Sequence, residues 1–204
     1  MTWIASDLHF GHKNIVRFKK PNGEYVRPGF VREDGVNVRF NEDIGVHDAS
    51  LIHRWNQRVG SRDTVYILGD FGHPLRLAES LNGRKTLILG NHDDKHNVND
   101  FGKYFVDVLS WKVFRDSFAM PVVLCHYPLH AQVDDPTPRK LCVHGHIHEK
   151  LIRQTDGTPD PWYINVCVEH TNHAPMAWEE LESIVNERKR IIGDIPHDGT
   201  LTRL

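Results

Sequence analysis

Hydrophobic residues along this chain gather in short runs that polar and glycine-containing segments separate. The runs are rich in Val, Ile and Leu and are too short for helices, which is typical of buried β-strands. Five runs predict strands at residues 3–6, 64–68, 86–89, 122–125 and 141–143. Two further stretches, 105–114 and 162–168, arrive close to other strands along the chain, so we expect part of the sheet structure to be mixed.

Three segments between these runs predict helices. Residues 48–59 place four apolar side chains on one face, and either Asp48 or Ser50 could cap the first turn. Residues 75–81 end before an Asn-Gly pair, which is a strong C-terminal stop signal. Residues 177–191 again place their apolar positions on one face. Helices that alternate with strands indicate an α/β protein.

The chain length of 204 residues fits one domain, and we expect residues 1–204 to form it because no internal repeat or linker interrupts them. Residues 19–47 stand apart as an insertion with strong turn signals, and residues 31–38 resemble a β-hairpin with a two-residue loop. The insertion follows the first polar segment discussed below. It is interpreted either as a gate for substrate or as a plain surface hairpin.

Composition excludes several classes of protein. The formal net charge of −2 gives no sign of an extended nucleic-acid surface, and no apolar run approaches the ~20 residues of a membrane-spanning helix. Three cysteines without a C-x-x-C pair indicate reduced thiols, so the expected location is the cytoplasm. Residues 13–39 contain seven basic and three acidic side chains, which indicates either a solvated hairpin or a basic rim that would attract a phosphorylated substrate. The basic residues are Lys13, Arg17, Lys19, Lys20, Arg27, Arg32 and Arg39.

Five short polar segments follow the predicted strands and carry metal-ligand residue types. Because loops at the carboxyl ends of strands are where α/β proteins bind ligands, we expect these side chains to converge. A carboxylate has two oxygens, so Asp70 could bind one ion with each. The set contains nitrogen and oxygen donors without a thiolate, which favours Mn²⁺, Fe or Zn²⁺ over a structural zinc. The candidate metal ligands are Asp7, His9, Asp70, Asn91, His126, His146 and His148.

Each segment alone is weak evidence, because an isolated Asp-x-His is more often a surface pair and Gly-Asn-His-Asp can be a plain turn. Together and in order, the segments D-x-H, G-D, G-N-H-D, H and G-H-x-H resemble the calcineurin-like metallophosphoesterase superfamily. The resemblance spans residues 7–148. The run Ser6–Asn14 is further similar to a small bacterial and phage branch of phosphoesterases.

This resemblance implies a sandwich of two mixed β-sheets flanked by α-helices, and a site for two divalent ions. Mn²⁺ is the expected ion, with Fe, Zn²⁺ or Ni²⁺ as alternatives. Asp70 would be shared between two ligand sets. The first set implied is Asp7, His9, Asp70 and His148, and the second is Asp70, Asn91, His126 and His146. Two ions about 3.5–4 Å apart would polarise the phosphoryl oxygens and supply a bridging hydroxide for in-line attack.

His92 follows a candidate ligand and is implied by the resemblance to be the catalytic acid. Many relatives carry Asp three residues after the bridging Asp, where it orients that histidine, but His73 occupies this position here. We therefore assign the orienting role to Asp93 or Asp94, with a backbone group as the alternative. Asp93 is included with His92 among the predicted catalytic residues.

The predicted function is metal-dependent hydrolysis of a phosphate ester. A modest basic rim on a small domain fits a small phosphodiester, such as a nucleotide or cyclic nucleotide, better than a long duplex. A phosphomonoesterase acting on a nucleotide, sugar or phosphoprotein would use the same ligands. The alternative from another class is a non-catalytic metal-binding scaffold. The oligomeric state is left open.

Overall fold

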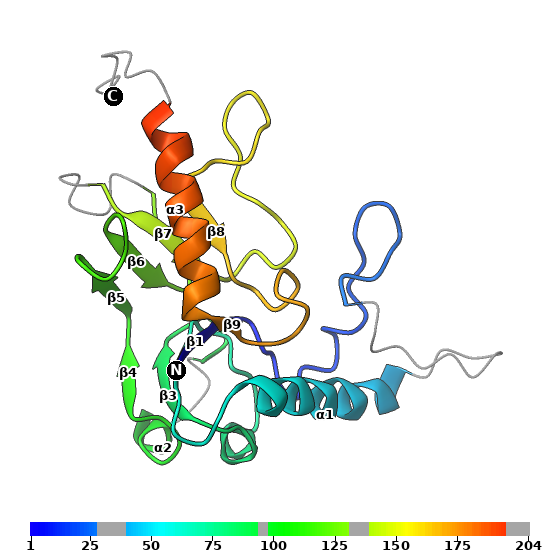
Figure 1. Cartoon of the computed structure of the whole chain (residues 1–204). Coiled ribbons are helices and arrows are strands. Elements are labelled where there is room, and N and C mark those ends of the chain that lie inside the picture. The colour runs from blue at the N-terminus through cyan, green and yellow to red at the C-terminus, as the bar shows by residue number, and fades with distance from the viewer. Residues whose placement is uncertain (28–39, 94–97, 131–138, 195–204) are drawn as a thin grey trace.

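The computed structural model describes residues 1–27, 40–93, 98–130 and 139–194. They form two β-sheets with helices outside them (Figure 1). The first sheet has the strand order β4-β3-β2-β1-β9, and the second has the order β5-β6-β7-β8. The strands are β1 (Thr2–Ala5), β2 (Thr64–Ile67), β3 (Arg84–Ile88), β4 (Asp107–Leu109), β5 (Trp111–Phe114), β6 (Val122–Cys125), β7 (Leu141–His144), β8 (Tyr163–Asn165) and β9 (Met176–Ala177).

Both sheets are mixed, as the sequence predicted. In the first sheet β1 to β4 are parallel and β9 pairs antiparallel with β1. In the second sheet β6, β7 and β8 are parallel and β5 pairs antiparallel with β6. The sheets meet beyond the end of β1, where Ser6 forms a parallel bridge to Cys167. This junction brings together the carboxyl ends of the parallel strands of both sheets.

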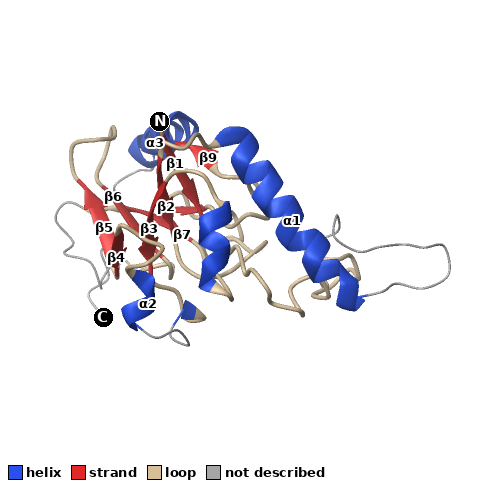
Figure 2. Cartoon of the chain, turned by 90° about the horizontal axis from the view of Figure 1, so that it is seen from below, coloured by secondary structure: helices blue, strands red, loops and turns tan. Residues whose placement is uncertain are grey.

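Alternating side chains of β1 serve two cores, as the period of two in a strand requires. Ile4 packs against Leu124 and Val143 of the second sheet, so the two sheets are packed face to face. Trp3, by contrast, belongs to the core on the other face of the first sheet, where Trp55 of helix α1 (Phe40–Arg58) packs. Figures 1 and 2 show α1 and α3 (Trp178–Asp194) outside the strands.

Helix α1 begins eight residues before the predicted start at Asp48. The apolar positions that predicted this helix begin only after Asp48, but Ile44 packs against Ile15 and Val16, and this tertiary contact extends the helix toward its N-terminus. Asp48 is therefore not a cap. Its carboxylate instead accepts a hydrogen bond from the backbone N–H of Gly11, which holds the loop after β1.

The predicted strand at residues 105–114 is two strands in different sheets. β4 pairs with β3 and β5 pairs with β6, so the chain crosses between the sheets at Ser110. The residue types along 105–114 do not by themselves reveal such a crossing. The helix predicted at residues 75–81 is a 3₁₀ helix, η2 (Leu75–Ser80). The short helix α2 (Val98–Phe101) was not predicted. The predicted hairpin at 31–38 lies outside the described residues.

Within the described residues, no helix is long and apolar enough to cross a membrane. This agrees with the absence of a long apolar run in the sequence.

Replacing Leu181 by Ala tests the contribution of α3 to the core between the sheets. Leu181 is fully buried in that core, so the cavity left should lower the free energy of unfolding by about 2–5 kcal/mol. Urea unfolding followed by circular dichroism measures the change. Glu182→Ala, one residue along on the exposed face, should stay within about 0.5 kcal/mol of the unaltered chain. Equal values for the two variants would contradict the packing described.

Candidate metal centre

The five polar segments meet at the junction of the two sheets. β1, β2 and β3 are neighbouring parallel strands, and the segments that hold Asp7, Asp70 and Asn91 follow them. β6 and β7 are parallel neighbours in the second sheet, and they are followed by His126 and His146. Each sheet therefore contributes one side of the site, and the face-to-face packing closes it.

Asp7 is fully buried, and its two carboxylate oxygens have different surroundings. Oδ2 accepts hydrogen bonds from the Ser6 hydroxyl (2.6 Å), the His146 backbone N–H (2.9 Å) and the Cys167 thiol (3.1 Å). Oδ1 has no hydrogen-bond partner among the described residues and lies 3.6 Å from Nε2 of His9. A buried oxygen without a donor is costly, so this arrangement is the one expected of a metal ligand.

The charge state of Asp7 suits that role. Burial would raise the pKa of Asp7, but the contact with His9 and the charge of His126 hold the pKa well below its usual range. The carboxylate is thus ionised wherever the protein is folded near neutral pH. A negative charge in a buried position needs a positive partner, which a divalent ion supplies.

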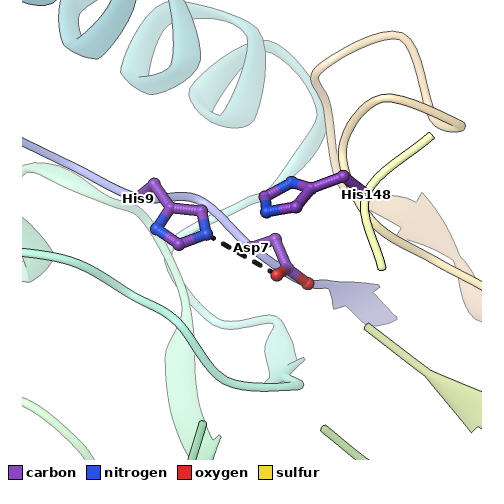
Figure 3. Close-up of side chains that lie close together, drawn as sticks. All are labelled: Asp7, His9 and His148. Carbon is purple, nitrogen blue, oxygen red and sulfur yellow. Dashed lines mark ion pairs between the residues drawn. The ribbon is translucent and has the colours of Figure 1, made fainter. Parts of the chain in front are cut away.

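His9 and His148 complete one group with Asp7 (Figure 3). The two imidazole rings stack with 5.1 Å between their centroids. Burial lowers the pKa of His9 to about 4, so its ring is neutral near pH 7 and keeps a lone pair for an ion. Neither ring nitrogen of His9 has a hydrogen-bond partner among the described residues. Nδ1 of His148 lies 2.9 Å from Glu169 Oε1, which leaves Nε2 for a ligand.

Asp70 lies between the two predicted ligand groups. Its Oδ2 is 3.4 Å from Nε2 of His9 on one side and 3.6 Å from Nε2 of His126 on the other. Its Oδ1 accepts a hydrogen bond from the backbone N–H of His92 at 2.8 Å. One oxygen therefore faces both groups while the other is tied to the neighbouring turn.

The second group converges on the side-chain oxygen of Asn91. Nε2 of His126 lies 2.9 Å from this oxygen, and Nδ1 of His146 lies 3.0 Å from it. Nδ1 of His126 donates to the Leu68 carbonyl at 2.9 Å, which fixes the tautomer with its lone pair on Nε2. The structure thus brings together all seven predicted ligands in two groups that share Asp70.

The backbone at these ligands is unusual. Five of the seven have positive φ angles between 51° and 72°, a backbone region that residues other than glycine rarely adopt. Such a conformation costs about 1–3 kcal/mol per residue and persists only where the surrounding structure imposes it. Its concentration at these positions indicates a functional site. The five are Asp7, His9, Asp70, His146 and His148.

Two glycines permit the close approach of the segments. A Cβ at Gly145 would overlap the Ser6 hydroxyl and Oδ2 of Asp7, and a Cβ at Gly90 would overlap Oδ1 of Asp70. These two glycines therefore allow the close approach because they have no side chain. Imidazoles, carboxylates and an amide oxygen with orphaned buried atoms fit a pair of divalent ions such as Mn²⁺, Fe or Zn²⁺.

His92 lies beside the ligands, with its ring 5.2 Å from that of His9 and 5.6 Å from that of His12. Asp93, predicted to orient it, directs both carboxylate oxygens elsewhere. They accept hydrogen bonds from the backbone N–H groups of Asp70, Phe71 and Gly90, at 2.8–3.0 Å. In the structure Asp93 thus joins the turns after β2 and β3. Asp94, the other residue proposed for this role, lies outside the described residues.

Sequence reasoning missed several residues that support the ligands. Glu169 accepts hydrogen bonds from His148 and from Arg27 on the same oxygen, Oε1. Burial would raise the pKa of Glu169, but the charge of Arg27 and the bond from His148 lower it to about 2. A signal for Glu169 was present, since it follows the apolar run 162–168 as the other polar segments follow theirs.

Arg27 was assigned to the basic rim, and this was wrong. The side chain is fully buried and makes a salt bridge with Glu169. No local signal distinguishes it from its exposed neighbours in a polar loop. Beside the site, His144 is buried and its Nδ1 lies 2.8 Å from the Gly145 carbonyl oxygen, and Cys125 and Cys142 are buried.

Comparison with known proteins gives the family. Residues 45–168, more than half of the chain, match the model of the calcineurin-like phosphoesterase superfamily domain. The chain therefore belongs to this superfamily, and membership supports metal-dependent hydrolysis of phosphate esters. Four of the five polar segments lie inside the match, whereas the segment that holds Asp7 and His9 lies outside it. The fold brings that segment to the others.

Individual relatives are similar to this protein over most of its length. The chain is 31% identical over 183 residues to the Gene 66 protein of Mycobacterium phage L5, which covers 74% of this chain and 79% of the phage protein. It is 27% identical over 206 residues to the uncharacterized protein MJ1445 of Methanocaldococcus jannaschii, covering 95% and 97%. The crystal structure of the protein of unknown function AQ665 from Aquifex aeolicus has the same fold, with a TM-score of 0.59, 22% identity and coverage of 91% and 99%.

Replacing Gly145 by Ala should impair metal binding. The new methyl group would overlap Ser6 and Asp7, displacing the buried carboxylate whose Oδ1 is an expected ligand. Metal content after Mn²⁺ loading and desalting, measured by mass spectrometry, should fall. Gly102→Ala is the matched control, because a methyl group at that position would meet nothing within 4 Å among the described residues. Full metal content in Gly145→Ala would show that the close approach is not required.

Proposed function

We propose that this chain is a phosphoesterase that uses two divalent ions, with Mn²⁺ as the expected native metal. The single observation that carries the proposal is the position of Asp70 Oδ2, which lies within 3.6 Å of both His9 Nε2 and His126 Nε2. When bound, two ions supply Lewis-acid polarisation of the phosphoryl group and activation of the attacking water. The first ion would be held by Asp7, His9, Asp70 and His148, and the second by Asp70, Asn91, His126 and His146.

His92 is the proposed proton donor to the leaving oxygen. Its backbone N–H is fixed by Asp70, and its ring borders a cavity of about 340 Å³ next to His9. A leaving group in this cavity would lie next to the imidazole. A well-placed general acid contributes about 10²–10⁴-fold to the rate. Because Asp93 is occupied by backbone donors, its proposed contribution is to hold the turn that carries His92.

Two cavities border the ligands, and this favours a phosphodiester. Besides the cavity next to His92, a larger one of about 590 Å³ lies beside His146 and His148. A phosphate held between the ligands would therefore have room for two organic groups, as a diester requires. A phosphomonoester would need only one of these spaces. Both a phosphomonoesterase and a non-catalytic metal-binding scaffold are outcomes that the experiments below distinguish.

The larger cavity has features suited to a nucleotide-like group. Lys19, Lys20 and Lys150 line it and can attract an anionic substrate. Phe18, with 47% of its surface exposed, presents an aromatic ring on which a base could stack. Lys19 and Lys20 belong to the basic rim predicted from the sequence, of which Arg32 and Arg39 lie outside the described residues. We propose a small phosphorylated substrate, with a nucleotide or cyclic nucleotide diester as the first choice.

Activity should depend on added metal and on Asp70. The metal-free chain is assayed with a generic aryl phosphodiester and the matching monoester, each with Mn²⁺, Fe²⁺, Ni²⁺ or Zn²⁺. We expect hydrolysis with Mn²⁺ and a higher kcat/KM for the diester. Asp70→Ala should lose both ions and the activity, since this carboxylate faces both groups. Full metal retention in that variant would contradict the shared ligand, and inactivity with every metal would favour the scaffold.

His92→Ala separates a proton donor from a metal ligand. His92 also lies close enough to His9 and Asp70 to be considered as a ligand, so metal content is the deciding measurement. As an acid, its loss should lower kcat by about 10²–10⁴-fold while both ions remain bound. The decrease should be smaller for a substrate whose leaving group has a low pKa, because that group needs less protonation. Loss of an ion, or unchanged turnover, would remove the assigned role.

A further inference from the structure

A buried ion pair lies behind the first ligand group. Arg27 has none of its surface exposed, and the side chain of Glu169 is 3% exposed. Nε of Arg27 donates to Oε1 of Glu169 at 2.8 Å, and the same oxygen lies 2.9 Å from Nδ1 of His148. Because Glu169 accepts the Nδ1 proton, His148 keeps the lone pair of Nε2 for an ion.

The remaining nitrogens of Arg27 hold the backbone that precedes His9. One terminal nitrogen donates to the Asp7 carbonyl at 2.6 Å, and the other donates to the Leu8 carbonyl at 3.2 Å. Asp7 has a φ angle of 57°, so its backbone needs such support. One guanidinium thus fixes Asp7 through its carbonyl and His148 through Glu169.

The second ligand group is supported differently. His126 is held by the Leu68 carbonyl, and His146 has its backbone N–H bonded to Asp7. Among the contacts described for these residues and for Asn91, none involves Arg27 or Glu169. The ion pair therefore contacts one group of ligands directly, and it reaches the other group only through the hydrogen bond from the His146 backbone N–H to Asp7.

We infer that Arg27 and Glu169 are positioning residues that act selectively on the ion held by Asp7, His9 and His148. This inference rests on the proposed two-ion site. The ion pair sets the tautomer of His148 and the direction of Asp7, and it contacts neither substrate nor the second group. Each of the two buried charges also stabilises the other, because burying either charge without a partner would cost free energy. The loop that carries Arg27 is thereby part of the metal centre.

The test measures Mn²⁺ binding to the metal-free protein by calorimetry, with electron paramagnetic resonance to report paired and single ions. Glu169→Gln keeps the shape of the side chain but removes its charge. We expect the affinity for one of two Mn²⁺ ions to fall by about 10–100-fold, the usual effect of losing such a partner. The resonance spectrum should change from that of a coupled pair to that of a single ion.

Combining variants identifies the ion affected. Asn91→Ala should weaken the other ion, so the double variant with Glu169→Gln should bind both ions weakly. If both substitutions acted on the same ion, the double variant would keep one ion at full affinity, and the inference would be overturned. Arg153→Ala is the control, since exposed Arg153 donates only to the Gly157 carbonyl among its described hydrogen bonds, and this variant should bind both ions normally.

Arg27→Lys provides a second route, because it keeps the charge but cannot reach three acceptors at once. It should lower the affinity for the same ion as Glu169→Gln does. Thermal unfolding of each metal-free variant accompanies the titrations. Equal weakening of both ions with a lower Tm would indicate a general structural role and overturn the inference. Normal binding of both ions by Glu169→Gln would overturn this inference but leave the two-ion proposal standing. A single ion in the unaltered chain would overturn the two-ion proposal as well.

Discussion

The buried carboxylate of Asp7 is the constraint on which the rest of the site depends. An ionised group in the interior must be compensated, and the fold supplies donors from three segments to one of its oxygens. These donors belong to Ser6 after β1, His146 after β7 and Cys167 after β8. Satisfying this one oxygen thus joins the two sheets, while the other oxygen stays available for an ion.

The two cores on either side of the first sheet hold the strained backbone conformations of the ligands in place. Trp3 and Ala5 of β1 anchor one core, and Ile4 anchors the other, so the strand that ends at Asp7 is held on both faces. Left-handed conformations can then persist immediately beyond the strand end. Glycines at Gly90 and Gly145 let neighbouring turns approach the carboxylates. Rigid strands and strained turns together hold the side chains of the site in place.

Much of the fold was predictable because its strands are short apolar runs with little ambiguity. The predicted strand at residues 122–125 matches β6 without a change of boundary. Prediction was wrong where a tertiary contact decided the outcome. Ile44 extends α1 past Gly45 by packing on Ile15 and Val16, and the run 105–114 divides because its halves find partners in different sheets.

The sequence by itself determined which donor atoms are present and that each follows a strand, because residue type and strand period are local properties. The tertiary structure decided how close those atoms come to one another, since Oδ2 of Asp70 lies near Nε2 of both His9 and His126 only when the sheets pack together. It also decided the support behind them. Arg27 and Glu169 are 142 residues apart, and two such charges become partners only when folding removes both from water.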